Sequence, residues 1–145
     1  ELLNLVGEEV MQHQTDRARA TVCRSMGTEL YNYMAGPVLD DFGKPVGHQW
    51  VVEFQPGRMQ PPSASLAQRI DAELQLLNGD YKVKRTGDLA LGMPELTVVP
   101  VGTFDAWLRQ KDRLGGQHKV PRLTHDEASI VAVKEASKQE LSPTC

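Results

Sequence analysis

The sequence has little of what marks membrane proteins, disulfide-stabilised proteins and nucleic-acid-binding proteins. Its 145 residues contain no apolar run near the roughly 18 residues of a membrane-spanning helix, and we recognise no signal peptide. Its two cysteines, Cys23 and Cys145, are too few for a disulfide framework. The formal net charge is -3, whereas phosphate backbones normally require a basic protein surface. These absences predict a cytoplasmic protein in a reducing compartment, with neither a membrane nor nucleic acid as its partner.

The common catalytic and nucleotide-binding motifs are also missing. The sequence has no P-loop and no G-x-G-x-x-G run, and no Ser/His/Asp or Cys/His pairing stands out. The histidines are scattered, and none of their spacings resembles that of a metal site; they are His13, His48, His118 and His125. We therefore expect no structural zinc, and we do not expect this chain alone to bind and activate a nucleotide.

What the sequence does contain is an ordinary globular balance, with 40% hydrophobic and 24% charged residues, at a length that suits one domain. Periodicity and turn residues predict the order β-α-β-β-α-β-α. The strands are expected at residues 2–6, 30–38, 48–55 and 95–101, and the helices at residues 15–26, 63–77 and 102–113. The first six elements match a ferredoxin-like βαββαβ layout. The prediction is an α+β fold with a four-stranded, mostly antiparallel sheet and helices packed on it.

The end of the chain has a different character. Residues 124–127 form a capping-box pattern, and residues 126–141 are compatible with a helix whose apolar stripe is thin. We therefore predict a small domain at residues 1–123, followed by a helical tail at residues 124–145 that docks on another surface or frays.

The most unusual stretch lies between Leu114 and Leu123. Gly115 and Gly116 give the backbone freedom, Pro121 stiffens the far side, and polar or basic side chains lie among them; these are Gln117, His118, Lys119 and Arg122. A short basic loop next to a flexible pair of glycines suits contact with a phosphate or a carboxylate. The alternative interpretation is a solvated connector that is basic by chance.

Two other groups of residues have a plain and a functional interpretation. Lys82, Lys84 and Arg85 form a second basic cluster, which we expect to be a solvated face rather than a substrate contact. Aromatic residues on two neighbouring strands are able to stack RNA bases, but packing beneath helices is the expected use because the chain is acidic; these residues are Tyr31, Tyr33, Trp50 and Phe54.

Four pieces of the sequence, taken in order, resemble one protein family. They are the runs Asn4–Val10, Leu77–Tyr81 with Lys84–Arg85, Gly102–Leu108 and Gly115–Arg122. Together they are similar to the C-terminal domain of the auxin-responsive acyl-acid amido synthetases, the Gretchen Hagen family, with the bacterial members more similar. The resemblance covers most of residues 4–123, and its most specific piece is the final run, which includes Gln-His-Lys-x-Pro-Arg.

The resemblance implies a role in an adenylate-forming ligase. Such an enzyme joins a small-molecule acid to an amino acid or other amine, using ATP with Mg²⁺. A large N-terminal adenylation domain of the same polypeptide holds most of the ATP and Mg²⁺, and a small C-terminal domain closes over it. This chain resembles the small domain, which is expected to be inactive alone. The alternative is a stand-alone ferredoxin-like binding or regulatory module without catalysis.

The resemblance also implies roles for individual residues. Lys119 is the expected catalytic cation and the first contact of the nucleotide or acyl-adenylate. The other expected contacts are Gln117, His118 and Arg122, although Arg122 has the alternative of anchoring the loop to its own domain. Plant members of the family generally have Tyr at the position of His118 and a longer loop before it. The hinge candidates are Gly7, Glu8, Gly115 and Gly116.

Overall fold

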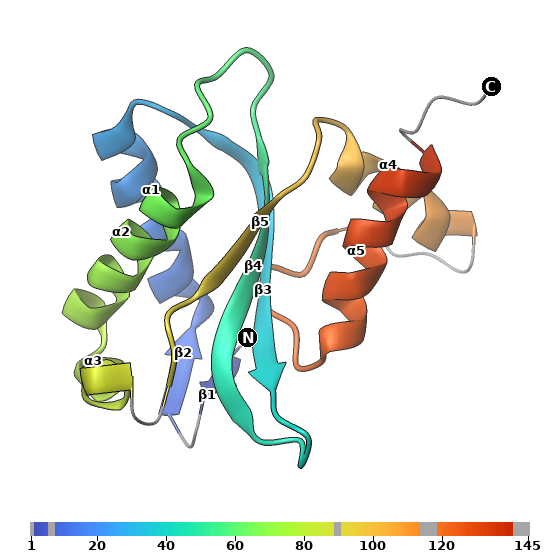
Figure 1. Cartoon of the computed structure of the whole chain (residues 1–145). Helices are drawn as coiled ribbons and strands as arrows, with labels where there is room; N and C mark the ends of the chain where they lie inside the picture. Colours follow the sequence, from blue (N-terminus) through green and yellow to red (C-terminus); the bar gives the residue numbers. More distant parts are fainter. Residues whose placement is uncertain (1, 6–7, 89–90, 114–118, 141–145) are drawn as a thin grey trace.

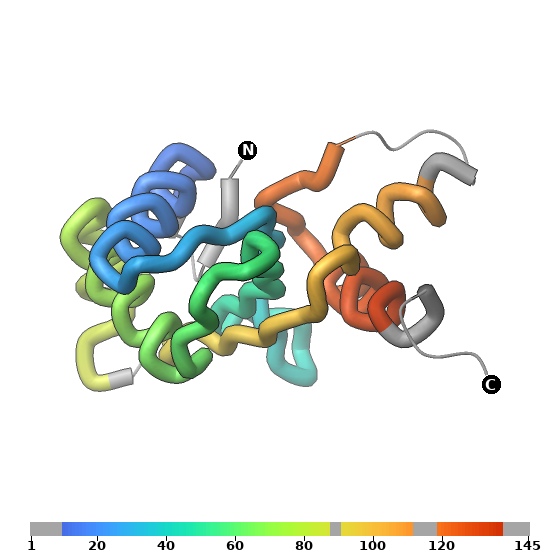
Figure 2. Tube along the Cα trace, turned by 90° about the horizontal axis from the view of Figure 1, so that it is seen from above, coloured from blue at the N-terminus to red at the C-terminus, as the bar shows by residue number. Residues whose placement is uncertain are grey.

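The computed structural model describes residues 2–5, 8–88, 91–113 and 119–140. A central sheet lies between two layers of helices, and this arrangement confirms the α+β class (Figure 1). Helices α1, α2 and α3 cover one face of the sheet, and α4 and α5 cover the other; the view from above shows the same layers (Figure 2). The helices are α1 (Gln12–Met26), α2 (Ser63–Leu77), α3 (Gly79–Arg85), α4 (Thr103–Arg113) and α5 (Glu127–Glu140).

The central sheet has three strands in the order β3-β4-β5. Strands β3 (Leu30–Leu39) and β4 (Pro45–Phe54) are antiparallel and joined by a tight turn, whereas β5 (Glu95–Val98) runs parallel to β4. Parallel neighbours require a long crossover connection, and α2 and α3 supply it. The sheet is therefore mixed, and β4 is its central strand.

The expected four-stranded ferredoxin-like sheet is wrong. The first strand, β1 (Leu2–Leu5), pairs with β2 (Glu8–Met11) in a separate antiparallel hairpin instead of joining the central sheet. A strand at 8–11 was missed because its Glu-Glu-Val-Met sequence has weak β-propensity. Pairing of neighbours in sequence closes a short loop, which costs little conformational entropy. The hairpin rests on the side of the sheet that carries α1, and Val10 enters the core there.

Each face of the sheet has its own core, because β4 is buried on both sides. Trp50, Val52 and Phe54 point into the first core, beneath α1 and α2, as their alternation predicts. Val51 points into the second core, with Phe104 of α4 and its neighbours. Helices thus cover both faces of the sheet.

Helix α5 docks on the second face. Its buried residues Ile130, Val133 and Ala136 recur every three positions, which accounts for the thin stripe in the sequence. They pack with α4 and the sheet, so the described part of the tail shares a core with the rest of the fold. Gly36 in β3 permits the approach, because a Cβ atom there would lie 2.7 Å from Cγ2 of Thr124. The domain boundary at residue 123 stays a prediction.

Candidate functional site

Of the basic segment, residues 114–123, the structure describes the part that begins at Lys119. The Lys119 side chain is exposed to solvent. Of the other predicted site residues, Glu8 lies in β2 and Arg122 is described in full. The remaining ones lie outside the described residues; they are Gly7, Gly115, Gly116, Gln117 and His118.

Residues 119–124 run along the free edge of β3. The amide nitrogen of Ala35 donates to the carbonyl oxygen of Arg122 at 2.8 Å, and the nitrogen of Thr124 donates to the carbonyl of Ala35 at 2.9 Å. The two bonds make a short parallel bridge between Ala35 and Leu123. Val120 packs toward the second core, whereas Leu123 is buried in the first. The segment is thus fixed in the gap between the two layers of helices (Figure 2).

The side chain of Arg122 is held by its own domain. Its Nη1 atom lies 2.8 Å from Oδ1 of Asp16 in α1, and its guanidinium carbon lies 5.4 Å from the ring centroid of Tyr33. The Tyr33 hydroxyl donates to the same Asp16 oxygen at 2.6 Å. Burial acts to raise the pKa of Asp16, but the hydrogen bonds from Tyr33 and Arg122 hold it below its usual range. The anchoring role therefore has an observed partner, and ligand contact by Arg122 stays a prediction.

A buried polar network continues from Tyr33 across the first core. The Tyr33 ring stacks on Trp50 with centroids 4.8 Å apart. The Trp50 Nε1 donates to Nδ1 of His48 at 2.9 Å, and His48 Nε2 lies 2.9 Å from the Tyr81 hydroxyl. An indole nitrogen is only a donor, so Nδ1 accepts and Nε2 carries the proton. Burial lowers the pKa of His48 to about 4, and the ring is neutral.

The network ends in a buried ion pair. Tyr81 donates its hydroxyl hydrogen to Asp71 of α2. Arg85 of α3 binds the same carboxylate with two nitrogens, at 2.7 and 3.1 Å, and donates to the carbonyl of Leu91 at 3.0 Å. Arg85 and Tyr81 hold the pKa of Asp71 below its usual range, although burial acts to raise it. The expectation of a solvated basic cluster is wrong for Arg85, whose side chain is only 6% exposed.

The start of α4 is occupied by a carboxylate from the sheet. Glu53 of β4 is buried and accepts hydrogen bonds from the backbone nitrogens of Gly102 at 2.9 Å and Phe104 at 2.8 Å. Burial raises the pKa of Glu53, while these two bonds act in the opposite direction. The positive end of the α4 dipole is therefore neutralised from within the domain.

Most of the sequence matches the model of one known protein domain. The sequence model of the GH3 family C-terminal domain matches residues 9–128. The chain belongs to the GH3 family. The resemblance drawn from the four sequence pieces, the Gretchen Hagen family, is thereby confirmed. No match is found among curated proteins.

Solved structures show the same fold for the GH3 domain. The structure is similar to that of AtGH3.15 acyl acid amido synthetase in complex with 2,4-DB, with a TM-score of 0.72 and 16% identity, over 93% of this chain and 25% of that one. A second match, GH3.15 acyl acid amido synthetase, has a TM-score of 0.69 and 17% identity, over 88% of this chain and 24% of that one. The GH3 domain described here thus spans about a quarter of either chain.

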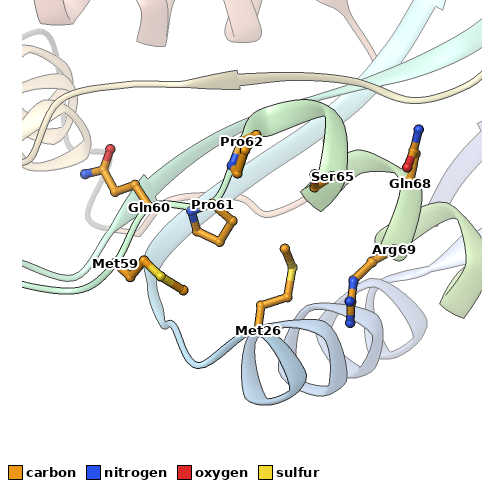
Figure 3. Close-up of a pocket in the computed structure, with 8 residues that line it drawn as sticks. All are labelled: Met26, Met59, Gln60, Pro61, Pro62, Ser65, Gln68 and Arg69. Atoms are coloured by element: carbon orange, nitrogen blue, oxygen red, sulfur yellow. The ribbon is translucent and has the colours of Figure 1, made fainter.

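A hollow of the GH3 domain lies away from the basic segment, between the end of α1 and the start of α2 (Figure 3). It is an open cleft of about 540 Å³. Its lining is mixed, with Met26, Met59, Pro61 and Pro62 beside Gln60, Ser65, Gln68 and Arg69. Arg69 donates to Ser25 at 3.2 Å, so its guanidinium is partly engaged with α1.

Within the described residues, no group of three or more His, Cys, Asp or Glu side chains is placed to hold a metal ion. Over the same residues, no helix has both the length and the apolar character needed to cross a membrane. Within the described residues, Lys119 and Arg122 place an exposed cation beside an anchored one.

Sequence reasoning found one part of this site and missed another. The glycine, proline and basic residues pointed to residues 114–123. The partners of Arg122 were missed, because no motif marks Asp16 and because Tyr33 was expected to serve core packing. Helix α1 begins at Gln12, so Asp16 lies inside the first turns of the helix and its carboxylate is available to Tyr33 and Arg122.

Proposed function

We propose that this domain is the closing C-terminal domain of an ATP-dependent acyl-acid amido synthetase, and that it acts with a large N-terminal adenylation domain of the same polypeptide. The observation that carries the proposal is the exposed Lys119 beside a firmly anchored Arg122, in a chain of the GH3 family. The shared fold with amido synthetases and the span of a quarter of their chains are consistent with it.

The proposed chemistry has two steps. In the first, a carboxylate oxygen of the acid attacks the α-phosphorus of ATP, and pyrophosphate leaves with the electrons of the broken P–O bond. In the second, an amine attacks the acyl carbon of the adenylate, loses a proton, and AMP departs. Both products of the first step are anionic, and two anions must approach one another to form them. A cation that arrives as water is excluded offsets this repulsion.

Lys119 is the proposed source of that charge. A lysine ammonium is a compact point charge on a flexible stem, which suits a group delivered by a moving domain. Gln117, His118 and Arg122 are proposed as further contacts of the nucleotide or acyl-adenylate. Gly7 and Glu8 at the start of the domain, with Gly115 and Gly116 in the loop, are proposed as the pivots of closure.

Mg²⁺ is assigned to the N-terminal domain in this proposal, together with most of the ATP. The described residues hold no cluster of carboxylates, histidines or cysteines arranged for a metal ion. No step of the proposed mechanism passes through a metal ligand of this chain. Its contribution is charge, closure and the exclusion of water.

The test is Lys119→Ala in the full-length protein. We expect acid- and ATP-dependent pyrophosphate release to slow by about 10²-fold, because one preorganised electrostatic contact to the transition state is lost. The matched control is Lys44→Ala, which removes another exposed lysine, from the β3–β4 turn. Normal pyrophosphate release in Lys119→Ala would contradict the proposal.

A further inference from the structure

We infer that Asp16 and Tyr33 are positioning residues of the basic segment: by holding Arg122 they set the place from which Lys119 meets its anion. The inference rests on the proposed function and adds two residues that no motif of the sequence indicates. Neither residue is proposed to touch substrate.

Two hydrogen-bond donors converge on one oxygen atom of Asp16. Oδ1 of Asp16 accepts from the Tyr33 hydroxyl at 2.6 Å and from Nη1 of Arg122 at 2.8 Å. Charge-assisted hydrogen bonds of this length are short and strong. The backbone carbonyl of Arg122 is bound independently by the amide of Ala35. Arg122 is therefore fixed at both its main chain and its side chain.

Tyr33, one of the residues that hold Arg122, is itself fixed in the core. The Tyr33 side chain is fully buried, and its ring is stacked on Trp50. Trp50 is in turn fixed by its hydrogen bond to His48, and the Tyr33 hydroxyl has a second partner in Oγ1 of Thr15 at 2.8 Å. The hydroxyl that reaches Asp16 thus belongs to the buried network and has little freedom to turn away.

The backbone of Lys119 lies close to that of the anchored Arg122. Lys119 precedes Arg122 by three residues, and successive Cα atoms are about 3.8 Å apart. The Cα atom of Lys119 therefore lies within about 11 Å of that of Arg122, whatever the course of the loop before it. An Arg122 that is held at its side chain as well as its main chain limits where the backbone of Lys119 lies, and loss of the side-chain contact loosens that limit.

A positioning role for the Asp16–Arg122 ion pair differs from an ordinary contribution to folding stability. The side chains of Asp16 and Arg122 are 32% and 31% exposed, and a partly exposed ion pair contributes little to folding. The pair Arg58–Glu29, at 3.1 Å and about half exposed, is a comparable ion pair outside the segment. If Asp16 acts on catalysis, its loss should change turnover far more than the loss of Glu29.

The experiment measures pyrophosphate release by full-length protein carrying Asp16→Asn, Tyr33→Phe or Arg122→Gln, with Glu29→Gln as the matched control. We expect the kcat of Asp16→Asn to fall about 10-fold, because small misplacements of a reacting group cost one or two orders of magnitude. The KM values for ATP and acid should change little, because the N-terminal domain is proposed to bind the acid and most of the ATP. Tyr33→Phe should lose less, Glu29→Gln nothing, and Asp16→Glu should recover part of the kcat.

A double mutant shows whether Asp16 acts through Arg122. The variant Asp16→Asn/Arg122→Gln should be no slower than Arg122→Gln alone, because residues of one unit are not additive. Additive losses, an unchanged kcat in Asp16→Asn, or a loss that lies wholly in KM would each overturn the inference. If Asp16→Asn does not fold, the kcat of Tyr33→Phe tests the positioning role in its place, since this variant keeps the stacked ring and loses only the hydroxyl.

Failure of the positioning role and failure of the proposed function give different results in these experiments. Slow pyrophosphate release in Lys119→Ala, together with wild-type kcat in both Asp16→Asn and Tyr33→Phe, overturns the positioning role alone. Normal release in Lys119→Ala removes the proposed function, and the positioning role with it.

Discussion

The two faces of the sheet are built by different means. The face under α1 and α2 contains a chain of buried polar side chains that runs from Tyr33 to the Asp71–Arg85 ion pair. The face under α4 and α5 is mostly apolar apart from the buried Glu53, and its described part includes one buried side-chain nitrogen without a hydrogen-bond partner, Nε1 of Trp107. Buried polar groups require matched geometry, whereas apolar side chains tolerate exchange at similar volume. The first face therefore fixes positions, and the second mainly supplies burial.

Among the changes that test this difference between the two faces, removal of Arg85 should cause the largest loss of stability. In Arg85→Ala the carboxylate of Asp71 stays buried without its bidentate partner, so we expect a loss of about 3–5 kcal/mol in the free energy of unfolding. Urea unfolding of the variant measures it. Arg58→Ala is the control, because its ion pair with Glu29 is about half exposed and should cost under about 1 kcal/mol. Equal losses in the two variants would show that the buried pair has no special weight.

Acid should weaken the first face before the second. The pKa of His48 is lowered to about 4 from an ordinary 6.5, so below pH 6.5 the unfolded chain binds a proton that the native chain does not. Stability should thus fall as the pH decreases from 6.5 to 4, by up to about 3 kcal/mol. Unfolding curves at several pH values measure the slope. His48→Gln should be less stable overall but lack this part of the slope; an identical slope would contradict the assignment.

The smallest expected loss of stability comes from a change on the second face, at Gly36. Gly36→Ala places a Cβ atom 2.7 Å from Cγ2 of Thr124, and we expect overpacking to cost about 1–3 kcal/mol. Gly47→Ala is the matched control in the neighbouring strand, since its Cβ atom would meet only Val38 at 3.9 Å. Thermal unfolding compares the two. The idea of a close crossing over β3 fails if Gly36→Ala is as stable as Gly47→Ala.

Local patterns predicted the elements that depend on local physics. The alternation of Trp50, Val52 and Phe54 identified β4, and the apolar stripe of residues 66–77 identified α2. The strand β2 was missed because its four residues bear two glutamates, and its pairing with β1 supplies what its propensity lacks. The parallel entry of β5 beside β4 depends on how the α2–α3 crossover packs, which no local pattern encodes.

For the candidate site too, the sequence predicted the features that are local and missed those that depend on tertiary packing. Glycines and basic residues within one short run identified the segment of Lys119, because flexibility and charge are visible in sequence. The partner of Arg122 lies 106 positions away, and that of Arg85 lies 14 positions away on another helix. A charge cluster looks solvated in sequence when its counter-charge is brought in by tertiary packing. Tyr81 and Arg85 do share one face of α3 at a spacing of four, which is the one signal that pointed inward.

The order of donors in the buried network has a consequence for proton movement. Trp50 gives its hydrogen to His48, His48 to Tyr81, and Tyr81 to Asp71. An indole never accepts, so no proton lost at the Asp71 end is replaced at the other. These side chains cannot conduct protons through the domain or switch between two hydrogen-bonding patterns. They keep a single arrangement, and the segment held through Tyr33, Asp16 and Arg122 keeps one position relative to the sheet.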